Sequence, residues 1–548
     1  MKKRFHIVVS IAVFCLIGAF VSCSSGAKTK TLPGESPRLY EWLGDENYQS
    51  PNHVTIDKNS LSNQIDGLAD EWWKDAVFYH IWVKSFNDYD GDGVGDFRGI
   101  TEKLDYIKND VGCDAIWLSP VFDCAGKGTA EGYNMHGYDT INYYDVNDYF
   151  GNVEQLENLL REAHKRGIKV IFDLVPNHTS SQHPWFLNSA SRRDGKANWY
   201  LWNNVRLSWN PMGSNATWHF NVDRQAYYYG AFWSGMPDLN FRNYEVREEM
   251  KNIARYWLNK GFDGIRMDAV RYLVEDPGVV MDTDETHAFF SEVRTEVIDK
   301  YAELGAPKFM VGEAWIVGDQ NRFFRYFGSE ENPEFNMLFD FDFSNQMPMA
   351  VRYRNLGVFD FPNADHLAVF LSNHDNAAGR PGTMYKADED IKLATAISLL
   401  LPATPFVYYG NEVGQPEEPN LGSQDIRHRY KLQWDRVEAQ KSDPDSLLML
   451  HKKLITLRSS HPALRRGSYL RVPVARPAAA YRLIHETEEI VCVYNLGTET
   501  EEIVLSVNAS DLEPLFLSSP SEANLLMMNE KVTVTLPAKG FAVYLVKK

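Results

Sequence analysis

Short apolar runs alternate with amphipathic stretches from Val77 to about residue 410. Each run has the length and the β-branched or aromatic content of a buried strand. Between the runs, stretches such as 153–166 and 246–260 place apolar residues three and four apart, the spacing of a helix with one buried face. The runs are Phe78–Val83, Ala115–Leu118, Lys169–Phe172, Gly264–Met267, Lys308–Val311, Leu338–Phe341, Leu367–Leu371 and Thr404–Tyr409. Eight strands alternating with helices predict an α/β fold, a closed (β/α)8 TIM barrel over residues 71–470.

Two segments break this alternation. Residues 179–243 follow the third strand, carry no helix of the barrel type and are crowded with Trp, Tyr, Asn and Gly. A connection of that length predicts a small inserted domain. From 471 to 548 the pattern changes to short alternating runs, such as Glu489–Tyr494 and Lys531–Leu536, which predict a C-terminal antiparallel β-sandwich.

The first 22 residues resemble an export signal. A basic start is followed by an apolar run over residues 7–21 and then by small residues. Cys23, directly after this run, is typical of a bacterial lipoprotein, in which the cysteine carries a lipid that anchors the protein to a membrane. A plain secretory signal is the alternative. Residues 23–70 are predicted to be a tether followed by irregular packing. Either signal places the folded part outside the cytoplasm, and the periplasmic or cell-surface face stays open.

Composition narrows the class of partner. The net charge is −18, with 74 acidic against 56 basic residues, which argues against a nucleic-acid partner and fits a neutral polar substrate. Aromatic residues make up 13 %, and sugars stack on such rings, although core packing accounts for most of them. Cys113, Cys124 and Cys492 show no metal-type spacing, so three buried free thiols are expected. The oligomeric state stays open.

Acidic residues follow several of the predicted strands. In a (β/α)8 barrel the carboxyl ends of all strands meet on one face, where catalytic residues lie. Asp268, Glu313 and Asp375 each follow a different strand. They are therefore expected to converge on one bond.

Five segments resemble the ordered signature segments of the α-amylase family of glycoside hydrolases. They are Asp173–His178, Met236–Asn240, Gly264–Asp268, Gly312–Trp315 and Ser372–Asp375. The resemblance spans most of the chain and implies the barrel, the inserted domain and the C-terminal β-domain described above. It also implies a retaining glycosidase, with Asp268 as the nucleophile and Glu313 as the acid that protonates the leaving oxygen and later activates water.

The resemblance assigns substrate contacts around this pair. Asp375 matches the third acid of the family, which grips sugar hydroxyls and favours the oxocarbenium-like state. His178 and His374 match its hydrogen-bond donors to that state. Tyr138 matches the ring that stacks on the sugar being cleaved, and His136 belongs to the same substrate-binding segment.

The residues around the two predicted catalytic carboxyl groups should favour opposite protonation states, with Asp268 ionised and Glu313 protonated. Arg266 lies two residues before Asp268, points to the same side of the strand and is expected to keep that carboxylate ionised. Glu313 needs a raised pKa so that it carries a proton near neutrality. Asp173 is expected to support its neighbours, as the matching acid does in the family.

A loop over residues 88–96 places oxygen donors at alternate positions, with Gly at the sharp turn. This arrangement suits a hard cation, and calcium is the expected cofactor. The loop resembles the calcium loop after the first strand in oligosaccharide-cleaving members of the family. The alternative is an acidic turn held by its own hydrogen bonds. The predicted ligands are Asp88, Asp90, Asp92, Val94 and Asp96.

The bond that is cleaved is harder to predict. Exo-acting α-glucosidases of the family carry an acid where Met135 stands here, which favours internal cleavage. Against this, Arg271 and Tyr272 replace a Lys-His pair of many α-amylases, and segment 236–240 resembles a group intermediate between oligo-1,6-glucosidases and neopullulanases. The prediction is a mainly endo-acting hydrolase of α-1,4 bonds in starch-type glucans and maltooligosaccharides. The alternatives are an exo-acting α-glucosidase or oligo-1,6-glucosidase, with or without transglycosylation, and a non-catalytic glycan-binding protein.

Overall fold

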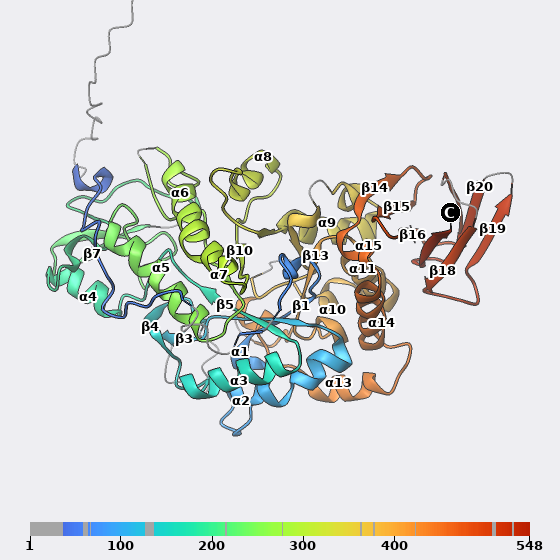
Figure 1. Ribbon diagram of the computed structural model, residues 1–548, viewed down its shortest axis with the longest axis horizontal. Helices are drawn as coiled ribbons and strands as arrows, with labels where there is room; N and C mark the ends of the chain where they lie inside the picture. Colours follow the sequence, from blue (N-terminus) through green and yellow to red (C-terminus); the bar gives the residue numbers. More distant parts are fainter. Residues whose placement is uncertain are drawn as a thin grey trace, which may run out of the picture.

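The computed structural model describes residues 37–57, 64–65, 67–125, 136–213, 216–276, 278–361, 364–375, 379–421, 424–506, 511–528 and 531–547. The predicted signal, Cys23 and Met135 lie outside these residues. No helix in the described part of the chain is long and apolar enough to cross a membrane. In Figure 1 the inserted segment lies at the left, the barrel in the middle and the C-terminal β-domain at the right.

Eight parallel strands form a closed barrel in the order β1-β13-β12-β11-β10-β9-β5-β2. They are β1 (Phe78–Ile81), β2 (Ala115–Leu118), β5 (Lys169–Leu174), β9 (Gly264–Met267), β10 (Phe309–Gly312), β11 (Met337–Phe339), β12 (Leu367–Val369) and β13 (Thr404–Tyr408). Each coincides with one of the predicted runs, so the predicted barrel is confirmed. Nearly all their residues are buried, because helices cover the outside and side chains fill the interior.

Amphipathic helices surround the barrel. In α3 (Val153–Lys165) a capping box joins Asn152 and Gln155, since each side chain accepts a hydrogen bond from the other's backbone N–H at 3.0 Å. Helix α5 (Tyr244–Asn259) starts two residues before the predicted stretch, because the side chain of Asn243 caps it.

The remaining helices of the barrel region are shorter or follow the later strands. They are α1 (Val83–Phe86), α2 (Phe97–Glu102), α6 (Asp284–Val293), α7 (Asp299–Glu303), α8 (Gln320–Phe324), α9 (Phe341–Tyr353), α10 (Pro381–Met384), α11 (Asp388–Leu400), α12 (Gln424–His428), α13 (Trp434–Lys441), α14 (Leu447–Ser460) and α15 (Pro462–Arg466).

Aromatic side chains fill much of the barrel interior. Phe78 and Phe406 stack with ring centroids 4.3 Å apart, and Trp73 stacks on Phe309 at 5.4 Å. These rings and Trp72 belong to one buried cluster that runs through the barrel interior and also includes Phe339 and Phe370. In barrels of this kind the functional site lies at the carboxyl ends of the strands.

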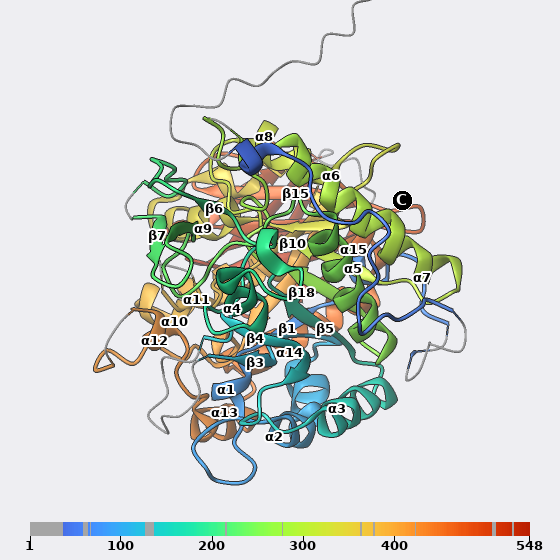
Figure 2. The same ribbon diagram turned by 90° about the vertical axis from the view of Figure 1, so that its left-hand side faces the viewer.

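The inserted segment contains α4 (Pro184–Ser191) and a three-stranded antiparallel sheet of β6 (Trp202–Asn203), β8 (Ala226–Tyr229) and β7 (Trp218–Asn221). In Figure 2 these elements face the viewer, and the C-terminal domain lies behind the barrel. Leu39, near the start of the described chain, is buried in one cluster with Trp209, Trp218 and Tyr229. Beside the barrel, β3 (Phe122–Cys124) pairs with β4 (Thr140–Val146).

The C-terminal domain has two antiparallel sheets, with orders β14-β15-β16-β21-β18 and β17-β20-β19. Its strands are β14 (Ser468–Val472), β15 (Ala478–Ile484), β16 (Glu489–Asn495), β17 (Glu501–Leu505), β18 (Asp511–Leu517), β19 (Asn524–Met528), β20 (Lys531–Leu536) and β21 (Phe541–Lys547). Residues from both sheets, among them Val493 and Val534, share one buried core. The predicted β-sandwich is confirmed. Cys113, Cys124 and Cys492 are buried, and none of the three forms a disulfide bond, as expected.

Candidate active site

Four acidic residues lie at the carboxyl ends of barrel strands. Asp173 belongs to the end of β5, Asp268 follows β9, Glu313 follows β10 and Asp375 lies beyond β12. Strands β10, β9 and β5 are adjacent, and Asp173 stands opposite Arg266 in the register of β5 with β9. The barrel thus brings together residues that are far apart in the sequence.

Arg266 is the centre of the buried part of this cluster. Its Nη1 lies 2.8 Å from Asp173 Oδ1 and 2.6 Å from Asp268 Oδ1, and its Nη2 lies 2.9 Å from Glu313 Oε1. The Arg266 side chain is only 1 % exposed, so water does not screen these ion pairs. One guanidinium group therefore holds the predicted nucleophile and the predicted acid side by side.

Burial raises the pKa values of both Asp268 and Glu313, but to different extents. It raises the pKa of Glu313 to about 8, opposed by Arg266 and reinforced by the charges of Asp268 and Asp375. It raises the pKa of Asp268 to about 6, although Arg266 pulls that pKa down. Arg266 favours the ionised form of Asp268, as expected, but burial outweighs the guanidinium and leaves the pKa above its usual value. Near pH 7 Asp268 is still mostly ionised and Glu313 mostly protonated.

The residue after Asp268 joins the two carboxyl groups through the backbone. Ala269 has φ of +49°, a left-handed conformation that residues with a Cβ adopt at some cost. Its N–H donates to Glu313 Oε2 at 3.1 Å. Backbone strain of this kind is common where a side chain must be aimed at a reacting group.

Asp375 lies in a separate hydrogen-bond network. Its Oδ2 lies 2.8 Å from His374 Nε2, and its Oδ1 accepts from the Arg429 guanidinium. Burial would raise the pKa of Asp375, but the contacts with His374, Arg429 and Arg266 outweigh it and hold this pKa well below its usual range. Asp375 is thus a permanent anion at this end of the barrel.

Tyr138 links that network to Asp173. Its hydroxyl lies 2.6 Å from His374 Nε2 and donates to Asp173 Oδ2 at 3.2 Å, and its ring stacks on His374 at 5.5 Å. His178 lies between the Asn177 side chain, at 2.8 Å, and the Tyr138 carbonyl, at 3.1 Å. Burial lowers the pKa of His178 to about 3, so its ring is neutral near pH 7.

These groups surround a pocket of about 580 Å³. All three predicted catalytic acids line it, together with His136, Tyr138 and His178. Arg266 and His374 lie beneath it, since they are buried and contact the lining acids. The structure therefore brings every predicted catalytic and substrate-binding residue to one place.

Other lining residues were not predicted from the sequence. Trp233 and Trp315 are 52 % and 39 % exposed and line the pocket, and Trp315 rests on Phe341 at 4.5 Å and 11°. Such open ring faces suit the apolar faces of sugars. Trp315 belongs to the signature segment Gly312–Trp315, so the sequence could have indicated its place in the pocket. Arg429 comes 54 residues after Asp375, and no sequence pattern indicated their contact.

The structure gathers part of the predicted calcium loop. Carboxylate oxygens of Asp88, Asp90 and Asp96 lie within 4.8 Å of one another. Asp92 is not in this group, and its Oδ1 accepts from the backbone N–H of Val94 at 2.8 Å. Several clustered carboxylates are the donor set that a hard cation prefers, so these residues fit calcium.

Comparisons with known proteins agree with this geometry. A profile described as "Alpha amylase, catalytic domain" matches residues 80–431. The chain belongs to the α-amylase family. Members of this glycoside hydrolase family include a relative named alpha-amylase 3 from Dictyoglomus thermophilum, 33 % identical over 86 % of this chain and 94 % of the relative. An oligo-1,6-glucosidase from Heyndrickxia coagulans is 30 % identical over 78 % of this chain and 92 % of the relative.

A solved structure extends the likeness to three dimensions. The crystal structure of α-amylase from H. orenii superposes with a TM-score of 0.74 and 29 % sequence identity, covering 86 % of this chain and 99 % of the other. The fold and the glycosidase family are thereby shown, while relatives of different specificity share them.

Proposed function

We propose that this protein is a retaining glycoside hydrolase that cleaves α-1,4-glucosidic bonds in starch-type glucans and maltooligosaccharides, mainly within the chain. The observation that carries the proposal is the pairing of Asp268 and Glu313 on the Arg266 guanidinium, with pKa values of about 6 and 8. A pair of carboxyl groups, one ionised and one protonated, is what double displacement at an anomeric carbon requires.

The two groups would act together in two successive steps. Glu313 donates its proton to the glycosidic oxygen while Asp268 Oδ forms a bond to the anomeric carbon, and the leaving sugar departs with that proton. Glu313, now a carboxylate, then accepts a proton from water, whose oxygen displaces Asp268. Asp375 is an anion in both steps, so it can grip sugar hydroxyls and favour the positively charged transition state.

The lining of the pocket favours cleavage within a chain. Among the described residues that line it, the only carboxylates are the three catalytic acids. The described lining therefore offers no further acid to bind the non-reducing end of a sugar. Exo-acting members of the family bind that end with an acid at the position of Met135. Met135 itself lies outside the described residues. The relative named alpha-amylase 3 supports the same choice.

A second candidate is an exo-acting α-glucosidase or oligo-1,6-glucosidase, able to transfer glucosyl units to sugars. It is supported by the oligo-1,6-glucosidase relative and by the segment Met236–Asn240. A non-catalytic glycan-binding protein is a weaker alternative, because Asp268, Glu313 and Asp375 are all present and line one pocket.

We also propose two properties outside the pocket. Calcium would be held by Asp88, Asp90 and Asp96, with the Val94 carbonyl and Asp92 as further predicted ligands. The cluster of carboxylates supports this proposal.

Export and lipidation at Cys23 would place the folded part outside the cytoplasm and anchor it to a membrane. This proposal is supported by the sequence of residues 1–23 alone.

The first products from maltoheptaose test the function. An endo-acting enzyme releases a mixture of shorter maltooligosaccharides in the earliest turnovers, resolved by chromatography. Glucose as the sole early small product would reject the endo assignment in favour of the exo-acting candidate. Isomaltose and pullulan, assayed in parallel, report any cleavage of α-1,6 bonds.

A further inference from the structure

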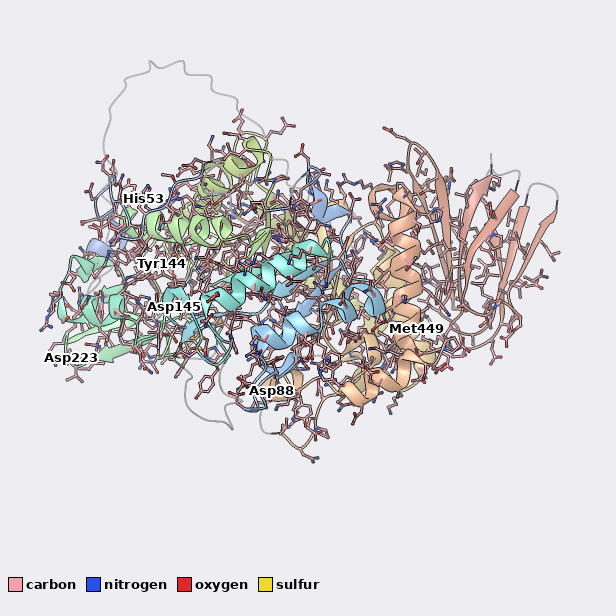
Figure 3. All side chains as sticks on the ribbon, turned by 60° about the horizontal axis from the view of Figure 1, so that its bottom comes forward. His53, Asp88, Tyr144, Asp145, Asp223 and Met449 are labelled. Atoms are coloured by element: carbon pink, nitrogen blue, oxygen red, sulfur yellow. The ribbon has the colours of Figure 1, made fainter. Side chains whose placement is uncertain are left out.

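A second hollow lies on the flank of the barrel, away from the catalytic pocket. It has a volume of about 550 Å³ and runs between α2 and α3, which lie side by side beside Asp88 in Figure 3. None of the described residues that line it also lines the catalytic pocket. We refer to it as the flank groove.

One end of the flank groove is formed by Tyr89. The ring is 48 % exposed, and the Arg98 guanidinium lies over one face, 3.9 Å from the ring centroid. The backbone is fixed, because the Tyr89 N–H donates to Asp96 Oδ2 at 2.8 Å while Asp96 Oδ1 caps α2 through the Gly99 N–H. The backbone of Tyr89 is therefore anchored, and its ring keeps exposed surface beside the Arg98 guanidinium.

The other walls offer hydrogen bonds without net charge. Glu154, Asn158 and Arg161 occupy one exposed stripe of α3, and Arg98 and Glu102 face the groove from α2. Two guanidinium groups balance two carboxylates, so neither an anion nor a cation is favoured overall. Together with the Asn158 amide they supply paired donors and acceptors, the groups that vicinal hydroxyls bind.

We infer that the flank groove is a non-catalytic binding site for a starch-type glucan, with the Tyr89 ring as its stacking platform. A neutral ligand with many hydroxyl groups and apolar ring faces matches both features of the groove. The inference rests on the proposed function for the choice of glucan. Binding there would keep a long chain attached to the enzyme while the catalytic pocket releases its products.

Adsorption to insoluble starch tests the inference. The Tyr89→Ala variant, made in a Glu313→Gln background that does not degrade the starch, is expected to bind about two- to tenfold more weakly than its parent, since aromatic contacts add about 0.5–1.5 kcal/mol beyond buried area. Tyr89→Phe keeps the ring and should bind as the parent does. Tyr353, 70 % exposed and outside the groove, provides the matched control Tyr353→Ala, which should also bind as the parent does.

The outcomes separate this site from the catalytic one. With Glu313 intact, Tyr89→Ala should hydrolyse maltotriose at the parent rate and lose efficiency only on starch. Parent-like starch binding by Tyr89→Ala, or equal losses in Tyr89→Ala and Tyr353→Ala, would overturn the inference. Failure of the proposed function would show instead as an unaltered protein that binds starch without hydrolysing maltoheptaose.

Discussion

This protein contains two clusters of three acidic side chains, and different groups offset the repulsion within each cluster. Asp173, Asp268 and Glu313 surround Arg266, a cation that the chain itself supplies and buries. In the loop after β1, backbone N–H groups donate hydrogen bonds to the clustered carboxylates, such as those of Gly91 and Gly93 to Asp88.

This difference is the reason why an external ion is proposed for the loop and not for the catalytic pocket. The Arg266 guanidinium holds the proposed catalytic carboxyl groups in place, and burial raises their pKa values to different extents. Backbone N–H groups orient the loop carboxylates but carry only partial charge, so the proposed calcium ion would offset the repulsion between them. The catalytic pair should therefore depend on Arg266, and the loop on calcium.

The largest effect is expected from removing either catalytic group. Asp268→Asn should lower kcat on maltoheptaose on the order of 10⁴-fold or more, because no nucleophile remains. Glu313→Gln should lower it about 10²- to 10⁴-fold, the range of general acid catalysis. Binding of maltoheptaose, measured by calorimetry, should persist in both variants.

The matched control for these variants is an exposed acid. Asp365, whose side chain is 51 % exposed, can be changed to Asn with little expected effect on turnover. Unchanged turnover in Asp268→Asn would refute the assigned nucleophile.

Replacing Arg266 tests directly whether the buried acidic cluster depends on this guanidinium. Arg266→Met leaves three buried carboxyl groups without their partner, and breaking a buried ion pair costs about 3–5 kcal/mol. Urea unfolding should show this loss at pH 8. The loss should be smaller at pH 5, where the three carboxyl groups of the variant are protonated and need no cation. A carboxyl group whose pKa is raised in the folded state stabilises the fold at low pH, and this contribution is lost as the pH rises.

Two further variants calibrate the Arg266 result. Arg266→Lys keeps a charge but cannot bridge the carboxylates with a planar fork, so an intermediate loss is expected. Arg471→Met breaks a pair with Asp360 at the surface and should change the unfolding free energy little. Equal losses in the Met variants at 266 and 471 would contradict the central role of Arg266.

The pH dependence of kcat/KM tests the separation of the two pKa values. Activity requires Asp268 ionised and Glu313 protonated, so it should rise through about pH 6 and fall through about pH 8. Because the groups interact, the two limbs report the pair rather than either residue. A profile without an alkaline limb between pH 7 and 9 would argue against Glu313 as the acid.

The sequence predicted the barrel well because its strands are short, fully buried and bounded by polar residues, as β9 and β10 illustrate. It predicted the acids because signature segments mark them. It could not show that Arg266 bridges to Glu313, since that contact depends on the register of neighbouring strands. It missed Arg429 for the same reason, because only the folded chain brings that residue to Asp375.

The smallest expected effect concerns the loop carboxylates. If calcium binds there, its removal with EGTA should lower the melting temperature by a few degrees, since saturation at 100 times the dissociation constant contributes about 2.7 kcal/mol. Turnover of maltoheptaose at 25 °C should change little, because the catalytic carboxylates have Arg266 as their own cation. Asp90→Asn should lower the melting temperature and abolish its response to calcium, whereas Asp365→Asn should leave both unchanged. A melting temperature that ignores EGTA in the unaltered protein would mean that the loop's hydrogen bonds suffice without an ion, and the contrast between the two groups would then be one of burial alone.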